Sequence, residues 1–296
     1  MNSQPLDSAD EIDKIARNLL MTSGAWGKFP TPVDEIVRFA ELQIEQGVDL
    51  SRIEPGFLTR NFHFLSRALT KALGMVDLRQ KVMYLDHSQP EARKSFIKLH
   101  EVGHKALSWQ SDLLGFMDDE STLDPETREK FEREASLFAS DALFQLDRFD
   151  DELKKLPLCI KSPQVLAKKF GGSNHAAIRR YVVRSPVRCA LLVLHKPTVS
   201  GEYSAKIRDY FQSEKFTADF GEIQWQPDHF GLEWVFVQEI KRGRHWHENG
   251  QMALELPCGE FITFRYHFFN NTYNTFVLIL PEGEHIKSRV TIISRP

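Results

Sequence analysis

Residues 99–104 read Leu-His-Glu-Val-Gly-His, so that His100 to His104 form an H-E-x-x-H motif. Apolar residues around the motif recur at helical spacing, which predicts a helix over about residues 91–109. Residues four apart lie on one helix face, so both imidazoles can reach one metal ion. Zinc accepts two histidines and a carboxylate and leaves a fourth position for water. Glu101 is then placed to take a proton from that water as a general base.

The third metal ligand is expected on the next predicted helix, residues 126–146, which offers Glu132 and Glu134. Glu132 has mostly polar neighbours three or four positions away, which indicates a solvated setting. Glu134 has three large apolar residues at those offsets, so its carboxylate needs a compensating partner, which a zinc ion would supply. The periodicity favours Glu134 as the ligand. It leaves open that Glu134 lies at the helix edge and pairs with an arginine.

The segments before the motif are predicted to be helices followed by one β-hairpin. Ser8 and Glu11 have the spacing of a capping box at the start of the first helix. Gly and Pro positions divide the rest into a helix over residues 31–45, a helix over 56–73, and a hairpin with strands 74–78 and 81–86.

The charge of the chain changes sign near residue 153. Residues 111–152 contain 14 acidic and 4 basic residues, whereas residues 153–201 contain ten Lys or Arg and no acid. Within the basic segment, helices over 162–170 and 174–183 flank a Gly-Gly-Ser turn, which is typical of a helix-turn-helix. A basic module indicates an anionic partner, and the alternative is that it docks on the acidic segment.

The C-terminal part, residues 186–296, is rich in short β-type runs and predicts a small α+β domain with an antiparallel sheet. The expected strands are residues 189–194, 232–240, 251–256, 261–268, 275–280 and 290–293, with one helix over 202–211. The three cysteines are too few and too scattered for a disulfide framework. The apolar runs are too short to span a membrane, and the polar N-terminus is not a signal peptide. We therefore expect a soluble, cytoplasmic protein without a membrane partner.

Two groups of cations are candidate nucleic-acid contacts. Neutralising the backbone and stacking bases on an aromatic ring is how sequence-neutral sites for single strands work. A solvated hairpin tip is the alternative for the second group. The candidates are Lys168, Lys169, Arg179, Arg180 and Arg184 in the basic segment, and Lys241, Arg242, Arg244 and Trp246 further on.

Three blocks of the chain together resemble the ImmA/IrrE zinc metallopeptidases. They are the hairpin of residues 74–86, the Leu-His-Glu-Val-Gly-His stretch, and residues 132–139, which read Glu-Arg-Glu-Ala-Ser-Leu-Phe-Ala. The family's last block reads E-x-E-A-N-x-F-A, and this chain has Ser136 where the asparagine usually stands. The resemblance implies a zincin-like, gluzincin-like fold with one zinc per chain. It implies His100, His104 and Glu134 as ligands, because the family's glutamate before the alanine is its third ligand.

The order of modules is also similar to IrrE-type proteins and to CapP-type proteases of antiphage islands. It implies a peptidase domain (1–152), a helix-turn-helix-like module (153–185) and a GAF-like sensor domain (186–296). Those relatives cleave a cognate repressor of the XRE helix-turn-helix type after DNA damage, prompted by single-stranded DNA. The alternative is a non-proteolytic, DNA-binding transcriptional regulator that retains the metallopeptidase fold. The intact Glu101 favours the enzyme, because a purely structural metal site needs no general base.

Overall fold

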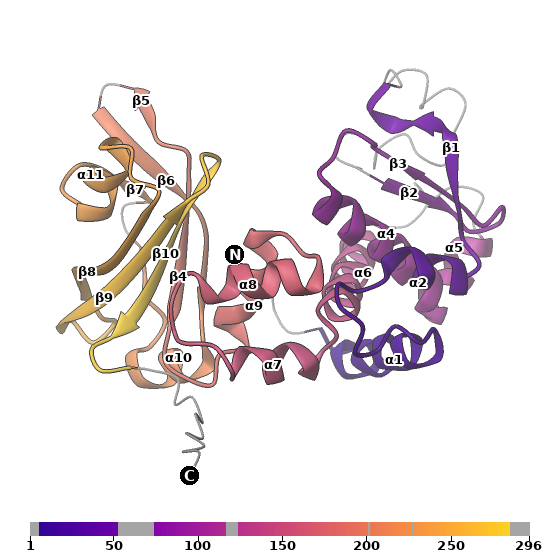
Figure 1. Cartoon of the computed structure of the whole chain (residues 1–296), viewed down its shortest axis with the longest axis horizontal. Helices are drawn as coiled ribbons and strands as arrows, with labels where there is room; N and C mark the ends of the chain where they lie inside the picture. The colour runs from indigo at the N-terminus through magenta and orange to yellow at the C-terminus, as the bar shows by residue number, and fades with distance from the viewer. Residues whose placement is uncertain (1–5, 53–73, 117–123, 201, 226–227, 285–296) are drawn as a thin grey trace, which may run out of the picture. The chain divides into compact units, whose positions relative to one another are not determined.

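The computed structural model describes residues 6–52, 74–116, 124–200, 202–225 and 228–284. The chain folds into two compact units (Figure 1). Residues 2–149 and 168–173 form the N-terminal unit, and residues 150–167 and 174–296 form the C-terminal unit. The sequence predicts three modules, whereas the structure divides the basic segment 153–185 between these two units.

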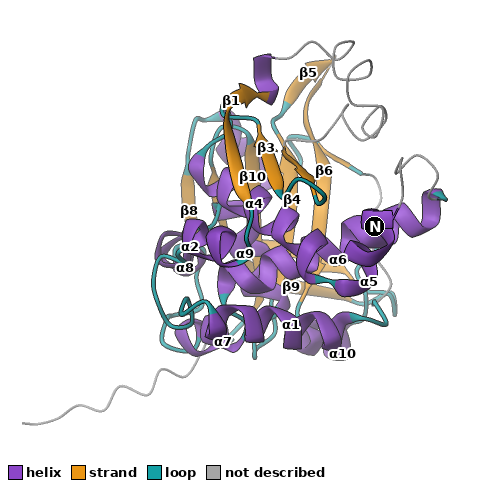
Figure 2. Ribbon diagram, turned by 90° about the vertical axis from the view of Figure 1, so that its right-hand side faces the viewer, coloured by secondary structure: helices purple, strands orange, loops and turns teal. Residues whose placement is uncertain are grey.

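The N-terminal unit consists of helices and one small mixed sheet, of which the sequence predicts only the hairpin of residues 74–86. The small sheet has the strand order β1-β3-β2, with β2 antiparallel and β1 parallel to β3. Figure 2 shows this sheet above α4, with α1 below. The elements are α1 (Ala9–Thr22), α2 (Val33–Phe39), β1 (Gln43–Asp49), a 3-10 turn (Leu50–Arg52), β2 (Gly74–Asp77), β3 (Val82–Leu85), α4 (Glu91–Ala106), α5 (Ser108–Phe116) and α6 (Pro125–Phe144).

The predicted helix over residues 31–45 is wrong beyond Phe39. Glu41 adopts a positive φ of 53°, which a helix cannot continue through. The chain then forms β1, whose Gln43 and Ile44 pair with Val82 and Met83 of β3. Pairing with a distant strand therefore overrides the local helical pattern. The hairpin of β2 and β3 is confirmed, and the predicted helix over 56–73 lies outside the described residues.

Helix α6 begins after Asp124, whose side chain accepts hydrogen bonds from the backbone N–H groups of residues 126 and 127. It packs closely against α4, because Gly103 leaves room for the α6 backbone. A Cβ at Gly103 would lie 3.3 Å from the Cα of Ala135 and 3.1 Å from the Phe138 ring. This close approach brings the histidine face of α4 next to α6.

The C-terminal unit is built on an antiparallel seven-stranded sheet, which confirms the predicted α+β class. The strand order is β5-β6-β4-β10-β9-β8, and β7 pairs with β6. Along the chain, the boundaries between the two units fall within α7 (Asp147–Leu153) and α8 (Ser162–Phe170). The other elements are α9 (Asn174–Val183), β4 (Ala190–His195), β5 (Thr198–Ser200), β6 (Glu202–Gln212), α10 (Glu214–Phe220), β7 (His229–Phe230), α11 (Val235–Lys241), β8 (Trp246–Glu255), β9 (Phe261–Asn270) and β10 (Asn274–Pro281).

Helices cover both faces of this sheet. Phe216 of α10 and Phe236 of α11 share one core with Val277 of β10. The neighbouring Phe276 points to the opposite face, where it contacts His175 of α9. Among the helices of the described ranges, none has both the length and the apolar character of a membrane span.

Two predicted elements of this unit are wrong. Residues 202–211 form strand β6 instead of a helix, because they pair with β4 while Tyr203, Ala205 and Ile207 line the core at a period of two. Residues 235–241 form helix α11 instead of part of a strand, with its buried residues at helical spacing. The predicted strand over 290–293 lies outside the described residues.

Candidate metal centre

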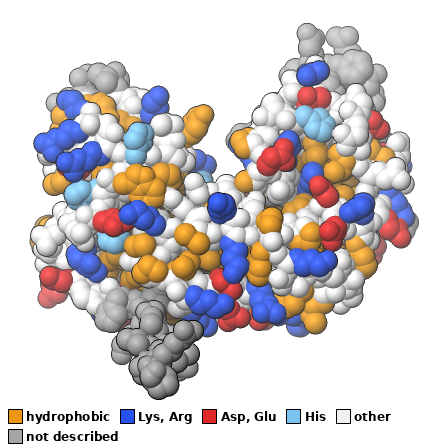
Figure 3. All heavy atoms as spheres, viewed as in Figure 1, with side chains coloured by type: hydrophobic (Ala, Val, Ile, Leu, Met, Phe, Trp, Pro, Cys, Tyr) orange, Lys and Arg blue, Asp and Glu red, His pale blue; other side chains and the backbone are white. Residues whose placement is uncertain are grey.

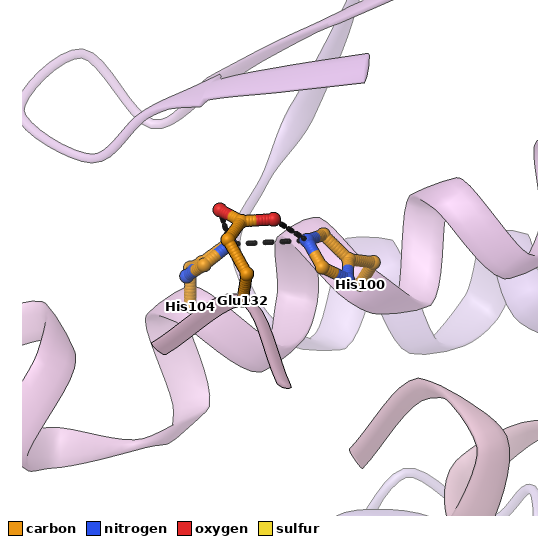
Figure 4. Close-up of side chains that lie close together, drawn as sticks. All are labelled: His100, His104 and Glu132. Carbon is orange, nitrogen blue, oxygen red and sulfur yellow. Dashed lines mark hydrogen bonds and ion pairs between the residues drawn. The ribbon is translucent and has the colours of Figure 1, made fainter. Parts of the chain in front are cut away.

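Two histidines on α4 and one glutamate on α6 meet at the surface of the N-terminal unit. His100 and His104 are one helical turn apart, and their Nε2 atoms lie 3.2 Å from each other. The Glu132 carboxylate lies 3.2 Å from His100 Nε2 through Oε2 and 3.6 Å from His104 Nε2 through Oε1. Figure 4 shows the three side chains converging. Within the described residues, these three form a group with the spacing of metal ligands.

The three side chains fit a tetrahedral metal ion. Zinc–nitrogen and zinc–oxygen bonds of about 2.0–2.2 Å require ligand atoms about 3.3–3.6 Å apart at tetrahedral angles. The two Nε2 atoms are 3.2 Å apart, and Oε2 of Glu132 is 3.2 Å from His100 Nε2. With one ligand atom taken from each residue, all three atoms lie within 4.8 Å of one another, which is close to that requirement. The Glu132 side chain is 58% exposed, so the site is open to solvent on this side. One coordination position can therefore be reached from outside.

Each histidine is held through its other ring nitrogen. His104 Nδ1 lies 2.8 Å from the side-chain amide oxygen Oε1 of Gln110, and His100 Nδ1 lies 3.3 Å from the hydroxyl of Ser136. Hydrogen bonds of this kind fix the ring orientation and leave Nε2 for a metal. Ser136, which replaces the family's asparagine, thus contacts a histidine of the motif. No motif or spacing in the sequence predicts this contact of Gln110 with His104.

The predicted choice of Glu134 as third ligand requires correction. Glu134 is buried, with 1% of its surface exposed, and its carboxylate accepts hydrogen bonds from Ser8, Trp109 and Gln110. Two residues that are two positions apart on a helix point about 200° away from each other. Glu132 therefore faces the histidines when Glu134 faces inward. The buried Glu134 carboxylate is predicted to need a partner that offsets its burial, and these three hydrogen-bond donors supply it in place of a zinc ion. The Ser8 hydroxyl is one of them, so it does not cap α1 as the capping box predicts.

Glu101 lies between the two histidines in the sequence of α4. It is buried against β2, where a Cβ at Gly74 would come within 3.2 Å of its Oε1. Burial raises the pKa of the Glu101 carboxyl, and the charges of His100 and His104 only partly oppose that effect. A glutamate with a raised pKa, next to a metal position, is suited to accept and return a proton.

The pKa values of His104 and Glu132 are shifted in opposite directions by their mutual contact. Burial alone would lower the pKa of His104, but its hydrogen bond to Glu132 and the charge of Glu101 outweigh burial and raise that pKa to about 9. Burial would raise the pKa of Glu132, but hydrogen bonds to His100 and His104 hold it well below its usual range. A metal ion therefore has to displace a proton from His104.

Several candidate nucleic-acid residues already have partners within their own unit. Arg184 forms a two-pronged ion pair with Asp150, and Arg242 and Arg244 both pair with the buried carboxylate of Glu239. These pairs reduce the free positive charge of both groups.

The remaining candidates lie against aromatic rings or at the surface. Arg179 is exposed on α9 and stacks on Phe211, and Lys241 lies over Tyr203. Trp246 is 37% exposed and packs on Phe269. In the N-terminal unit, Lys168 is exposed and Lys169 lies over Phe29. In the C-terminal unit, Arg180 is half-buried on α9. Figure 3 shows Lys and Arg side chains gathered where α11 lies.

Residues 58–181 match the M78 peptidase family through its IrrE N-terminal-like domain. This domain belongs to the IrrE-like peptidase family. The match includes α4, α5 and α6, and thus every residue of the metal centre, and it confirms the resemblance seen in the sequence. The family supports a peptidase with a bound metal.

A solved structure described as a "Mycobacterium tuberculosis transcriptional regulator" has a similar fold. The TM-score is 0.52 at 14% sequence identity, over 92% of this chain and 76% of that chain. At this identity the similarity concerns the fold. No curated protein matches this chain in sequence.

We predict that Glu132→Gln abolishes stoichiometric metal binding, because it removes one of three ligands. Glu134→Gln should still bind one zinc at saturating concentration, because its side chain lies outside the ligand set. Elemental analysis after zinc loading and desalting measures both, with Glu129→Gln, an exposed residue of α6, as control. Full zinc content in Glu132→Gln together with loss in Glu134→Gln would restore the assignment made from sequence.

We also predict that metal affinity rises with pH up to about 9. With a His104 pKa of about 9, the imidazole is protonated at neutral pH and must release its proton to bind metal. Each pH unit below 9 should therefore weaken apparent zinc affinity about tenfold. Calorimetry in buffers of different ionisation enthalpy should detect the released proton. Zinc binding at pH 7 without proton release would contradict this charge state.

Proposed function

We propose that this chain is a zinc-dependent endopeptidase that cleaves a cognate XRE-type helix-turn-helix repressor and so relieves repression. The observation that carries the proposal is the convergence of His100, His104 and Glu132, together with the buried Glu101 that follows His100 in the sequence of α4. Zinc bound there would polarise the peptide carbonyl and lower the pKa of a bound water. The ligand set supports zinc, because two imidazoles and one carboxylate are typical of zinc peptidases.

Glu101 is proposed to act as general base and then general acid. Its pKa is raised by burial, which brings it closer to the neutral pH at which it must exchange a proton. The close contact with Gly74 holds the carboxylate between β2 and the histidines. Any larger residue at this position of β2 would meet Ile97 at 2.1 Å and disturb that arrangement.

The C-terminal unit is proposed to be a GAF-like sensor domain that controls the peptidase in a DNA-damage or antiphage response. Its antiparallel sheet with helices on both faces supports this architecture. The helices α8 and α9, separated by Gly171 at φ +79°, support a helix-turn-helix-like arrangement of residues 153–185. The context of repressor cleavage comes from the ImmA/IrrE resemblance.

Single-stranded DNA is proposed as the activating partner. Arg179 is the best-suited cation, because it is exposed and forms no ion pair among the described residues. Trp246 is the best-suited ring for stacking on a base, because it is 37% exposed. Arg184, Arg242 and Arg244 are less suited, because DNA would have to compete with Asp150 or Glu239 for them.

Glu101→Gln should keep zinc and fold but lower repressor cleavage by about 10²–10⁴-fold, the usual effect of removing a general acid–base group. Cleavage of a candidate helix-turn-helix repressor from the same genome can be followed by gel, with zinc content measured on the same sample. If Glu101→Gln relieves repression in cells as well as the unmodified protein does, the non-proteolytic regulator is the correct function.

DNA binding should weaken with salt, at a slope of about −0.7 per phosphate neutralised on a single strand. Arg179→Glu should lower both the affinity and this slope, whereas Arg184→Gln should change them less because Arg184 is already paired. Fluorescence anisotropy with a labelled oligonucleotide measures both quantities. Equal affinity of the unmodified protein and Arg179→Glu would contradict this contact.

A further inference from the structure

A chain of hydrogen bonds leads from the metal centre to the start of helix α1. His104 Nδ1 lies 2.8 Å from Gln110 Oε1, and Gln110 Nε2 lies 2.7 Å from Glu134 Oε2. The other carboxylate oxygen of Glu134 accepts a 2.6 Å hydrogen bond from the Ser8 hydroxyl. Trp109 Nε1 donates to Glu134 Oε2 at 2.8 Å. All of these residues belong to the N-terminal unit.

The direction of these hydrogen bonds follows from their chemistry. The Gln110 amide nitrogen faces two groups that can only accept, the Phe131 carbonyl at 3.2 Å and the Glu134 carboxylate. The opposite end of the amide is therefore its oxygen, which accepts the proton of His104 Nδ1. Once the imidazolium releases its second proton, the neutral ring keeps its proton on Nδ1, and Nε2 of His104 holds the lone pair on the side of His100 and Glu132. Gln110 thus selects the metal-binding tautomer.

Glu134 supplies the charge in this chain of contacts. A carboxylate with 1% exposure needs compensation, and three donors provide it. The negative charge polarises the Gln110 amide and so makes the His104 ring a stronger electron donor toward a metal. Because Ser8 is 126 residues away in sequence, its contact with Glu134 also fixes the start of α1 against α6.

We propose that Gln110, Glu134 and Ser8 form a positioning relay for His104, through which the docking of α1 and metal binding stabilise each other. Coupling of this kind is reciprocal: if the docked α1 raises metal affinity by some factor, metal raises α1 docking by the same factor. The relay rests on the proposed metal centre and is independent of the substrate. Gln110, Glu134 and Ser8 are positioning residues, because each acts on the site through His104.

The first test removes the link next to the histidine. Gln110→Leu should weaken zinc affinity by about 10–100-fold, the usual effect of losing a residue that orients a metal-bound histidine. It should also remove the slowly exchanging His104 Nδ1 proton from the NMR spectrum of the zinc-loaded protein. Ser111→Ala, at the half-buried neighbouring position, should change neither. Unchanged affinity and an unchanged Nδ1 signal in Gln110→Leu would overturn the relay.

The second test changes Ser8, which lies at the other end of the relay, where α1 begins. The Ser8 side chain is only half-buried. Ser8→Ala should lower zinc affinity, and Ser8→Thr, which keeps the hydroxyl, should restore it. Ser23→Ala, at the other end of α1, is the matched control. If Ser8→Ala binds zinc as tightly as the unmodified protein, the relay does not reach α1.

A double-mutant cycle separates the relay from two unrelated structural effects. Ser8→Ala should cost little further zinc affinity once Gln110→Leu is present, because both act through the same path. If the fold losses in zinc affinity of the two single variants multiply in the double variant, the two residues act independently and the coupling is overturned. Hydrogen exchange of the α1 amides should slow on adding zinc, and this slowing should disappear in Gln110→Leu.

None of these measurements needs peptidase activity. A chain that cleaves no repressor but shows the coupling would leave the relay intact and refute only the proposed function. If Gln110→Leu does not fold, the Ser8 and Ser23 variants carry the test alone.

Discussion

The metal centre depends on the close packing of helix α4 against helix α6. Gly103 makes this possible, since a Cβ there would press on the Ala135 backbone and on Phe138. The two histidines project from α4 and Glu132 projects from α6, so a small separation of the helices would spread the ligands apart. The glycine within the motif thus has a packing role beside the chemistry of His100 and His104.

The same helix pair also buries a carboxylate that takes no part in the ligand set. The Glu134 carboxylate accepts hydrogen bonds from a hydroxyl, an indole and an amide. Hydrogen bonds from three neutral donors offset the cost of desolvating the charge. This arrangement leaves the charge of Glu132 for a metal and uses that of Glu134 to orient His104 from behind.

In the C-terminal unit, clusters of like charge in the sequence are partly neutralised in space. Asp150, from the acidic segment, pairs with Arg184 of the basic segment, and the buried Glu239 pairs with Arg242 and Arg244. Exposed cations such as Arg179 remain for an anionic partner. A count of charges along a chain therefore overstates the positive surface that a nucleic acid would meet.

The sequence by itself determined the metal-binding helix, the hairpin beside it and the α+β class, because these follow from local spacing. It placed His100 and His104 on one face, since helical periodicity alone requires this. Only the tertiary structure decided between Glu132 and Glu134. Apolar neighbours show that Glu134 is buried, but its burial partners come from Ser8 and from α5, which periodicity along α6 cannot reveal.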